Sequence, residues 1–236
     1  MPERQDVAVP YTWREFQAGA VAGLPLAVSA AIYGIVFGAV AAQAGIELLV
    51  ATAMSALVFA GGAQLACMPL WTYPLPIVAL TAMTLAVNAR YFLQSASLRP
   101  MLDTGSKAKT YGSLFILSDG GWALAMHRWR THPIDGGFLF GTNFVQAMPW
   151  MVCTLVGHAI GNRIGSPATF GLDFIFPAVF AAMAAHLWRK RSDIGPVVVG
   201  AGAAVLASRY VPGHWTILIG GFAGSLMGAF ARGRKS

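Results

Sequence analysis

The chain has 236 residues, of which 56% are hydrophobic and only 11% charged, and its net charge is +7. Soluble domains carry about 25% charged residues, so this composition excludes an ordinary water-exposed surface and indicates that lipid surrounds much of the chain. The basic residues lie mainly between apolar runs, a pattern typical of membrane proteins and not of nucleic-acid binding. Cys67 and Cys153 both lie in apolar stretches, outside any paired metal-ligand motif.

A membrane-spanning helix needs about 20 apolar residues, and the candidates in chain order are Phe16–Gly45, Leu48–Leu70, Pro74–Leu98, Tyr111–Trp129, Gly137–Ile160, Leu172–Leu187, Ile194–Tyr210 and Trp215–Ala231. We therefore predict an all-α fold, a polytopic transmembrane helix bundle of about seven or eight helices, some of them broken or kinked. Residues 1–15 form a polar N-terminal tail, 16–231 a single transmembrane domain, and 232–236 a basic C-terminal tail. The N-terminus lacks the order of a cleaved signal peptide, so we expect the first run to act as the insertion signal.

Two of these runs are irregular. Pro25 interrupts the first run, which also contains several glycines, and we predict a tilted or broken helix there. The run Tyr111–Trp129 contains Asp119 near its middle, so it either spans the membrane or enters and turns back. If it spans, there are about eight helices with both termini in the cytoplasm; if not, there are about seven with the N-terminus outside. Both topologies place the C-terminus and the basic cluster Arg189–Arg191 in the cytoplasm.

A possible internal repeat links two of the runs. Gly23-Leu24-Pro25, followed by Gly34 and Gly38, resembles Ala147-Met148-Pro149, followed by Gly157 and Gly161. Many transporters consist of two such repeats with the binding site between them. Chance similarity between helices rich in alanine and glycine explains the pattern equally well.

The third run contains polar side chains where lipid-facing residues would be apolar. Asn88 and Arg90 lie well inside it, and polar residues at such depth are candidates for function. An amide and a forked guanidinium suit the carboxylate of an amino acid. Alternatively, Arg90 forms a structural ion pair with Asp119 or extends to the membrane interface.

The second run contains the segment Phe59-Ala60-Gly61-Gly62-Ala63-Gln64. Adjacent glycines can open a helix and free backbone groups to face a cavity, which would place Gln64 beside the opening. The alternative is that Gly61 and Gly62 only allow close helix packing.

Other polar residues in apolar runs have simpler explanations. Asp119 can carry a proton or pair with a substrate ammonium group. Asp173 stands at a helix start, where the helix dipole favours an acid, and Pro177 can kink that helix. His158 is most simply a hydrogen-bonded buried histidine. No motif of a soluble enzyme is present, so we expect no catalysis and no cofactor; the rival functions are a membrane-embedded enzyme using Asp119 and His158, and a non-transporting scaffold subunit.

An ordered set of motifs resembles the AzlC family, the large subunits of branched-chain amino acid exporters. The matching residues are Gly23-x-Pro25, Gly34-x-x-x-Gly38, Ser55, Phe59 to Gln64, Asn88-Ala89-Arg90, Ser118-Asp119 and Leu172-Asp173-Phe174-x-x-Pro177. The chain departs from the family pattern at Ala89 and Tyr91, where Asn-Leu-Arg-His is common, and at Gly120, where Asp-Glu is common.

The resemblance implies a secondary transporter that exports branched-chain, hydrophobic L-amino acids across the bacterial inner membrane with a small hydrophobic AzlD-type subunit. We expect one substrate cavity lined by Gly61, Gly62, Gln64, Asn88 and Arg90. For proton coupling or gating, the expected residues are Asp119, Pro25 and Pro177. The loss of the second acid at Gly120 leaves the substrate and the coupling ion open.

Overall fold

The computed structural model describes residues 9–102, 106–163, 194–211 and 215–233, and the regular elements within these ranges are helices. The chain forms two compact units, one of residues 1–68 and 87–165 and the other of residues 69–86 and 166–236. Three described helical segments are long and apolar enough to cross a membrane: Trp13–Gln43, Ile77–Leu98 and Gly136–Gly161. The prediction of an all-α membrane bundle is confirmed. The predicted run Leu172–Leu187, with Asp173 and Pro177, and the cluster Arg189–Arg191 lie outside the described residues.

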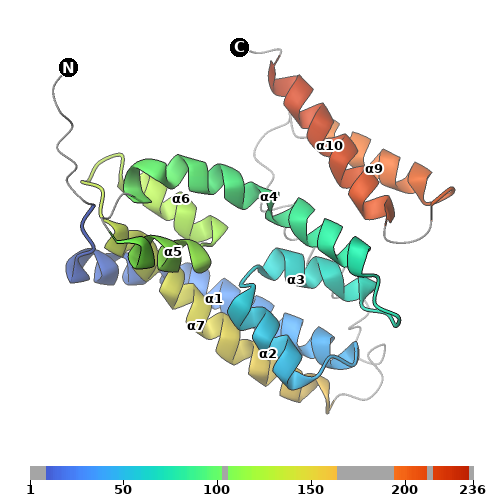
Figure 1. Cartoon of the computed structure of the whole chain (residues 1–236), viewed down its shortest axis with the longest axis horizontal. Helices are drawn as coiled ribbons and strands as arrows, with labels where there is room; N and C mark the ends of the chain where they lie inside the picture. The colour runs from blue at the N-terminus through green and yellow to red at the C-terminus, as the bar shows by residue number, and fades with distance from the viewer. Residues whose placement is uncertain (1–8, 103–105, 164–193, 212–214, 234–236) are drawn as a thin grey trace. The chain divides into compact units, whose positions relative to one another are not determined.

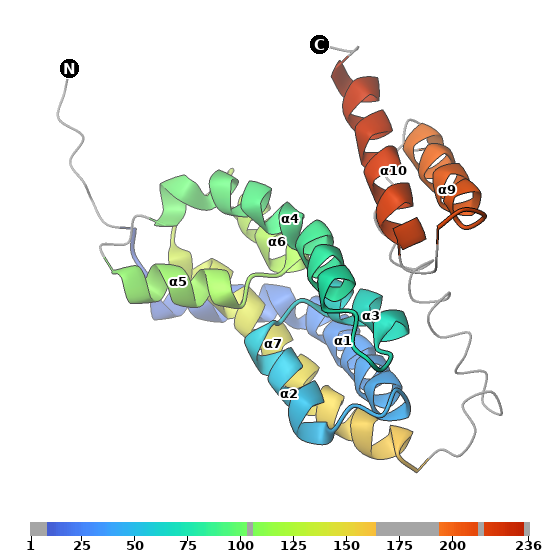
Figure 2. The same cartoon turned by 45° about the vertical axis from the view of Figure 1, so that its right-hand side comes forward.

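The first unit is built on two parallel helices, α1 (Trp13–Gln43) and α7 (Gly136–Gly161). Gly19 lies against Phe138, Gly23 against Thr142 and Gly38 against Thr154, so the positions advance together along both helices. Figures 1 and 2 show the two helices side by side over their whole lengths. Glycine at these points lets the backbones approach closely, which is the main source of helix association in lipid.

Of the two alternatives predicted for the first run, a tilted or a broken helix, the break is absent, because α1 is continuous and Pro25 lies inside it. A proline removes one backbone hydrogen bond, and membrane helices tolerate this where a neighbouring helix packs against them. The 31 residues of α1 extend about 46 Å, which exceeds the roughly 30 Å of a bilayer core and agrees with a tilted helix. The second half of the possible repeat reaches into residues outside the described part, so the repeat stays a prediction; its two proline-containing helices point the same way.

The run Tyr111–Trp129 enters and turns back. It consists of two helices, α5 (Lys107–Phe115) and α6 (Asp119–Arg128), with a break before Asp119. Both ends of this hairpin lie where α1 begins, because the Tyr11 hydroxyl lies 2.7 Å from Ser113 Oγ and Arg128 Nη2 lies 2.9 Å from Glu15 Oε1. This arrangement differs from both topologies considered from the sequence. In the first the run crossed the membrane, and in the second the N-terminus lay on the opposite side from Lys107 and Arg128. In the structure, the start of α1 lies on the same side as both of these residues.

Tyr11 fixes the base of this hairpin to the start of α1. Its ring lies 5.6 Å from the ammonium group of Lys109, and its hydroxyl also donates to the Lys109 carbonyl at 3.3 Å. Burial raises the pKa of the Tyr11 phenol above its ordinary value; the Ser113 hydrogen bond lowers this pKa and the Asp135 charge raises it. The phenol therefore stays protonated and keeps its hydrogen bonds at neutral pH.

A second hairpin enters from the opposite end of α1 and α7. It consists of α2 (Leu48–Leu57) and α3 (Gly61–Cys67), followed by a short 3-10 helix, Met68–Leu70. His158, near the end of α7, hydrogen-bonds the Ile46 carbonyl at 2.8 Å and so fixes the base. The Gln64 amide donates to Ser55 Oγ at 3.3 Å, which brings α3 back beside α2. The predicted span Leu48–Leu70 is thus a folded-back pair, and Figure 1 shows the tips of the two hairpins pointing towards each other.

The remaining crossing helix of this unit is α4 (Ile77–Leu102), of which residues 87–102 belong to the first unit. Leu98 packs in a buried cluster with Leu117, Ala125 and Phe138, near the start of α7. Arg90, two turns earlier, pairs with Asp119 at the tip of the α5–α6 hairpin. This part of α4 therefore runs antiparallel to α7.

In the second unit, α9 (Ile194–Ala207) and α10 (Trp215–Gly233) form an antiparallel pair. Gly200 lies against Gly220, and Pro196 lies against Gly224, so the positions run in opposite directions. Both predicted runs, Ile194–Tyr210 and Trp215–Ala231, contain helices, but their described apolar parts, Ile194–Ala207 and Ile219–Phe230, are shorter than the three segments that could cross a membrane.

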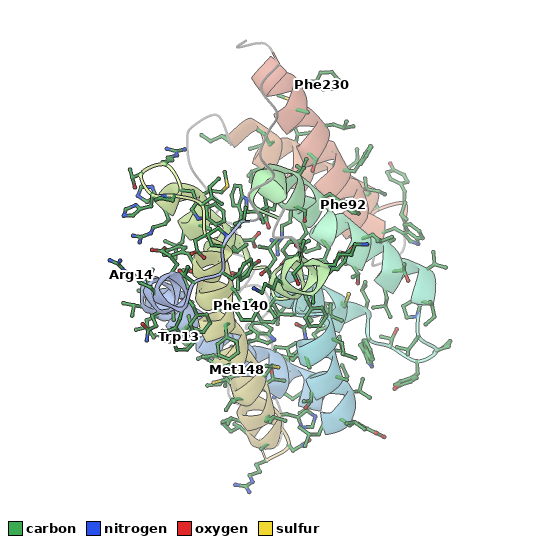
Figure 3. The ribbon with its side chains drawn as sticks, turned by 60° about the vertical axis from the view of Figure 1, so that its left-hand side comes forward. Trp13, Arg14, Phe92, Phe140, Met148 and Phe230 are labelled. Atoms are coloured by element: carbon green, nitrogen blue, oxygen red, sulfur yellow. The ribbon has the colours of Figure 1, made fainter. Side chains whose placement is uncertain are left out.

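The side chains of the first unit are arranged as in a membrane protein. Large apolar side chains face outward on α1 and α7, including Val21, Leu24, Val28, Ile32, Met148 and Val152. Figure 3 shows Phe140 and Met148 along α7, with Trp13 and Arg14 at the start of α1. Polar side chains of α7 are buried instead, as expected where lipid is the outer solvent.

The hairpins make the sidedness of the first unit testable. Of the cations whose side chains the structure describes in this unit, five lie at the end where α1 and α7 begin, namely Arg14, Lys107, Lys109, Arg128 and Arg130, whereas Arg163 lies at the other end. Excess Lys and Arg mark the cytoplasmic side, so we predict that this end faces the cytoplasm. In a background without cysteines, an impermeant thiol reagent added to intact cells should label Glu47→Cys and leave Lys107→Cys and His132→Cys unlabelled. Opposite labelling of the last two variants would show that α5–α6 spans the membrane.

The glycine contacts between α1 and α7 predict a sharp difference between two substitutions. A Cβ at Gly38 would collide with the Thr154 carbonyl and lie 2.7 Å from His158 N, whereas a Cβ at Gly112 in α5 has no neighbour within 4 Å. Gly38→Ala should lower the melting temperature of the detergent-solubilised protein by about 2–10 °C through overpacking. Gly112→Ala is the matched control and should leave it unchanged or slightly higher, because alanine favours helix. Equal effects would disprove the close backbone contact.

Candidate functional site

A stripe of buried polar side chains runs along α7. Its members are Thr142, Asn143, Gln146, Thr154 and His158, and each is at most 7% exposed. The side chains of Thr142, Asn143, Gln146 and Thr154 each donate to the carbonyl four residues before them, which satisfies part of their polarity. The amide oxygens of Asn143 and Gln146 accept from Ser118 of one hairpin, and Thr154 Oγ1 lies 3.0 Å from Ser55 Oγ of the other.

The tip of α5–α6 is held by Asn143. Its Oδ1 accepts from Ser118 N at 3.0 Å and from Ser118 Oγ at 2.7 Å. The same hydroxyl caps α6 by accepting from Gly121 N at 2.9 Å. Asp119 therefore stands in the first turn of α6, where the helix dipole favours a negative charge.

Asp119 also joins this tip to α4. Its Oδ2 lies 3.1 Å from Arg90 Nη1, and its Oδ1 accepts from Gln94 Nε2 at 2.7 Å. The ion pair considered as an alternative from the sequence thus exists in the structure. Asn88 Oδ1, Arg90 Nε and Gln94 Oε1 are buried without a hydrogen-bond partner in the described part of the chain. The group has more donors and acceptors than its own contacts use.

The tip of α2–α3 is held by Ser55, which is fully buried. Thr154 donates its hydroxyl to the Trp150 carbonyl, so Ser55 must donate to Thr154 Oγ1, 3.0 Å away. Ser55 Oγ then accepts from Trp150 Nε1 at 3.2 Å and from Gln64 Nε2 at 3.3 Å. These bonds fix the Gln64 amide with its oxygen free, and Gln64 Oε1 is buried without a partner in the described residues.

The adjacent glycines do not open the helix themselves. The break comes before them, at Phe59, whose φ of 40° lies in the left-handed region that bulky residues rarely adopt. Gly61 and Gly62 are the first residues of α3, and a Cβ on Gly61 would collide with the indole of Trp150. The packing alternative is therefore correct for Gly61, while Phe59 stores the strain of the turn.

The two tips reach α7 at neighbouring levels. One contacts Asn143 and Gln146, and the other contacts Trp150. Gln146 and Trp150 are four residues apart, about 6 Å along the helix axis, close to the middle of α7. The described contacts join Asp119 to Arg90 and Gln94, and join Gln64 to Ser55, without linking the two groups directly.

Several members of these groups are not among the residues predicted from the sequence. Asn143, Gln146 and Thr154 lie inside the predicted run Gly137–Ile160, and the rule applied to Asn88 and Arg90 would have singled them out. Gln94 lies one turn after Arg90 and shares its helix face, a spacing that could have identified it.

The other candidate residues have structural contacts or lie elsewhere. His158 is a hydrogen-bonded, buried histidine: its Nε2 must donate to the Ile46 carbonyl, and its Nδ1 lies 3.2 Å from the Asn162 amide. Pro25 lies within α1, and Pro177 lies outside the described residues. Among the described residues, no group of three or more His, Cys, Asp or Glu side chains could hold a metal ion.

Comparison with known proteins gives a consistent result. A protein of Bacillus subtilis (strain 168) described as "Branched-chain amino acid transport protein AzlC" is 24% identical over 197 residues, covering 82% of this chain and 76% of that protein. An "Uncharacterized membrane protein" of Helicobacter pylori (strain J99) is 24% identical over 191 residues, covering 80% and 82%. No solved structure matches. The model of the AzlC family, described as AzlC protein, matches residues 25–164, more than half of the sequence, and the chain therefore belongs to the AzlC family.

Proposed function

We propose that this membrane transport protein exports branched-chain, hydrophobic L-amino acids across the bacterial cytoplasmic membrane, together with a small AzlD-type subunit. The observation that carries the proposal is the meeting of two discontinuous helical hairpins near the middle of α7. The description of the Bacillus subtilis relative as a branched-chain amino acid transport protein supports the substrate class.

Discontinuous helices suit transport for a physical reason. A helix break inside a membrane leaves backbone amides and carbonyls without intrahelical partners, and these are tolerated only where protein or a water-filled cavity surrounds them. Secondary transporters place such breaks at the substrate site near the bilayer midplane. Here one break lies at Val58–Ala60, just after Ser55, and the other at Ile116–Ser118. Ser55 bonds Trp150 of α7, and Ser118 bonds Asn143 of α7.

The substrate site that we propose lies at these tips. Arg90, with Asn88 beside it, supplies charge and hydrogen bonds for a carboxylate, and Asp119 can meet an ammonium group. Gly62 and the free oxygen of Gln64 line the same cavity from the other tip in this proposal, whereas Gly61 packs against Trp150. Pro25 and Asp119 remain the candidates for gating or proton coupling in the described part of the chain.

The rival proposal, a membrane-embedded enzyme, lacks the geometry it needs. Asp119 lies at the α5–α6 tip near Asn143, whereas His158 is fifteen residues further along α7, about 22 Å along the axis. An acid and a base must approach within hydrogen-bond reach of one substrate, directly or through one water. These two residues do not form such a pair.

Export and the need for a partner are tested in one assay. Cells are loaded with a leucine-containing dipeptide, which intracellular peptidases hydrolyse, and the appearance of leucine outside is measured. We expect the chain expressed with an AzlD-type subunit to raise leucine and valine efflux several-fold above vector, with lysine unchanged. The chain alone should give no increase.

Each part of the proposal has its own contradicting result. Full efflux by the chain alone would show that no partner subunit is needed. Faster uptake without efflux would show that the protein imports amino acids. A preference for lysine would remove the hydrophobic substrate class. Gly112→Ala, which touches no part of the proposed site, serves as the control for expression and insertion.

A further inference from the structure

The Arg90–Asp119 pair has an unusual surplus of unused hydrogen-bonding groups. Arg90 touches Asp119 through one nitrogen, Nη1, at 3.1 Å, although a guanidinium and a carboxylate can pair through two parallel bonds. Arg90 Nε is buried and unpaired in the described part of the chain. The arginine therefore keeps part of its fork available for a second oxygen ligand.

Gln94 adds a hydrogen-bond acceptor, and its bond to Asp119 shows which end of the amide is the oxygen. Because its Nε2 donates to the Asp119 carboxylate at 2.7 Å, the amide cannot be flipped, and Oε1 must point away from that carboxylate. Gln94 is only 8% exposed, and Oε1 accepts no hydrogen bond from the described residues. A buried amide oxygen in this state lacks the donor that buried acceptors normally have.

The pair is also open to a small molecule. The side chains of Arg90 and Asp119 are 29% and 49% exposed in the structure. The polar side chains of α7 in the same unit are buried instead. Gln94, beside Arg90 and Asp119, is also buried. The open face thus presents one cation and one anion, and a free acceptor lies buried beside them.

We propose that Arg90 and Asp119 form an exchange site for a zwitterion, a proposal that rests on the proposed amino acid transport. The substrate's α-carboxylate replaces Asp119 as the partner of Arg90 and uses its Nε. The α-ammonium pairs with Asp119 and donates to Gln94 Oε1. The charges sum to zero with and without substrate, so no buried charge is left unpaired in either state.

This arrangement selects for substrates that carry both charges. An α-keto acid could replace Asp119 at Arg90, but it would leave the Asp119 carboxylate without a cation. An amine could pair with Asp119, but it would leave Arg90 without an anion. The dipole at the start of α6 stabilises the Asp119 charge while its partner changes.

The test uses the full chain with its small subunit in vesicles and three competitors of labelled leucine counterflow: leucine, 4-methyl-2-oxopentanoate and 3-methylbutylamine. We expect the keto acid and the amine to compete at least about 100-fold more weakly than leucine, because each leaves a charged group of the site unpaired. Asp119→Asn should abolish leucine counterflow and should strengthen binding of the keto acid relative to that of leucine. Arg90→Gln should do the same for the amine.

The double variant separates this role from a structural ion pair. Removing both charges of a structural pair is often nearly neutral, so Arg90→Gln/Asp119→Asn would then recover leucine counterflow. The exchange site predicts that the double variant stays inactive while melting as the wild type does. The pair Arg128–Glu15, with Nη2 and Oε1 2.9 Å apart, is the matched control, and its double Gln variant should stay active.

The outcomes distinguish this inference from the proposed function. Counterflow of leucine with equal competition by the keto acid, or an active Arg90→Gln/Asp119→Asn variant, would overturn the exchange site and leave amino acid transport intact. If only zwitterionic amino acids without a branched side chain raised the melting temperature of the protein, the proposed substrate class would be overturned and the exchange site retained. Stabilisation by no zwitterion would overturn both.

Discussion

The close parallel contact of α1 and α7 is the constraint on which the first unit depends. At Gly19, Gly38 and Gly157 the two backbones approach so closely that a Cβ on any of them would overlap a carbonyl of the facing helix. In lipid there is little hydrophobic gain from bringing helices together, so close packing of small residues supplies the attraction. Both hairpins then attach to this pair, one at each end.

The hairpins in turn depend on the polar stripe of α7. Each tip interrupts a helix, and its free backbone groups would be costly against lipid. Asn143 satisfies Ser118 at one tip, and Ser55 links Trp150 to Gln64 at the other. Replacing the stripe by apolar residues would leave the helix breaks without hydrogen-bond partners. The breaks in the hairpins therefore depend on the buried polar side chains of α7.

The two described ion pairs of this unit occupy different positions on the α5–α6 hairpin. Arg128 and Glu15 join its base to α1, where Arg128 also lies 5.3 Å from the ring of Phe138. Arg90 and Asp119 join its tip to α4, with unused groups around them. The ion pair at the base fixes the hairpin. The ion pair at the tip positions the hairpin and also leaves hydrogen-bonding groups free to bind a ligand.

The sequence by itself determined the membrane environment, the helical class and most helix positions, because these depend on local hydrophobicity and on the length of each apolar run. It also identified Asn88, Arg90 and Asp119 as polar residues at membrane depth. Only the tertiary structure decided that Leu48–Leu70 and Tyr111–Trp129 fold back on themselves, that Pro25 lies in an unbroken helix, and that Gly61 makes room for Trp150. Hydropathy gives the same value for a run that crosses and for one that returns, since the difference lies in contacts such as Tyr11 with Ser113, which join residues far apart in the chain.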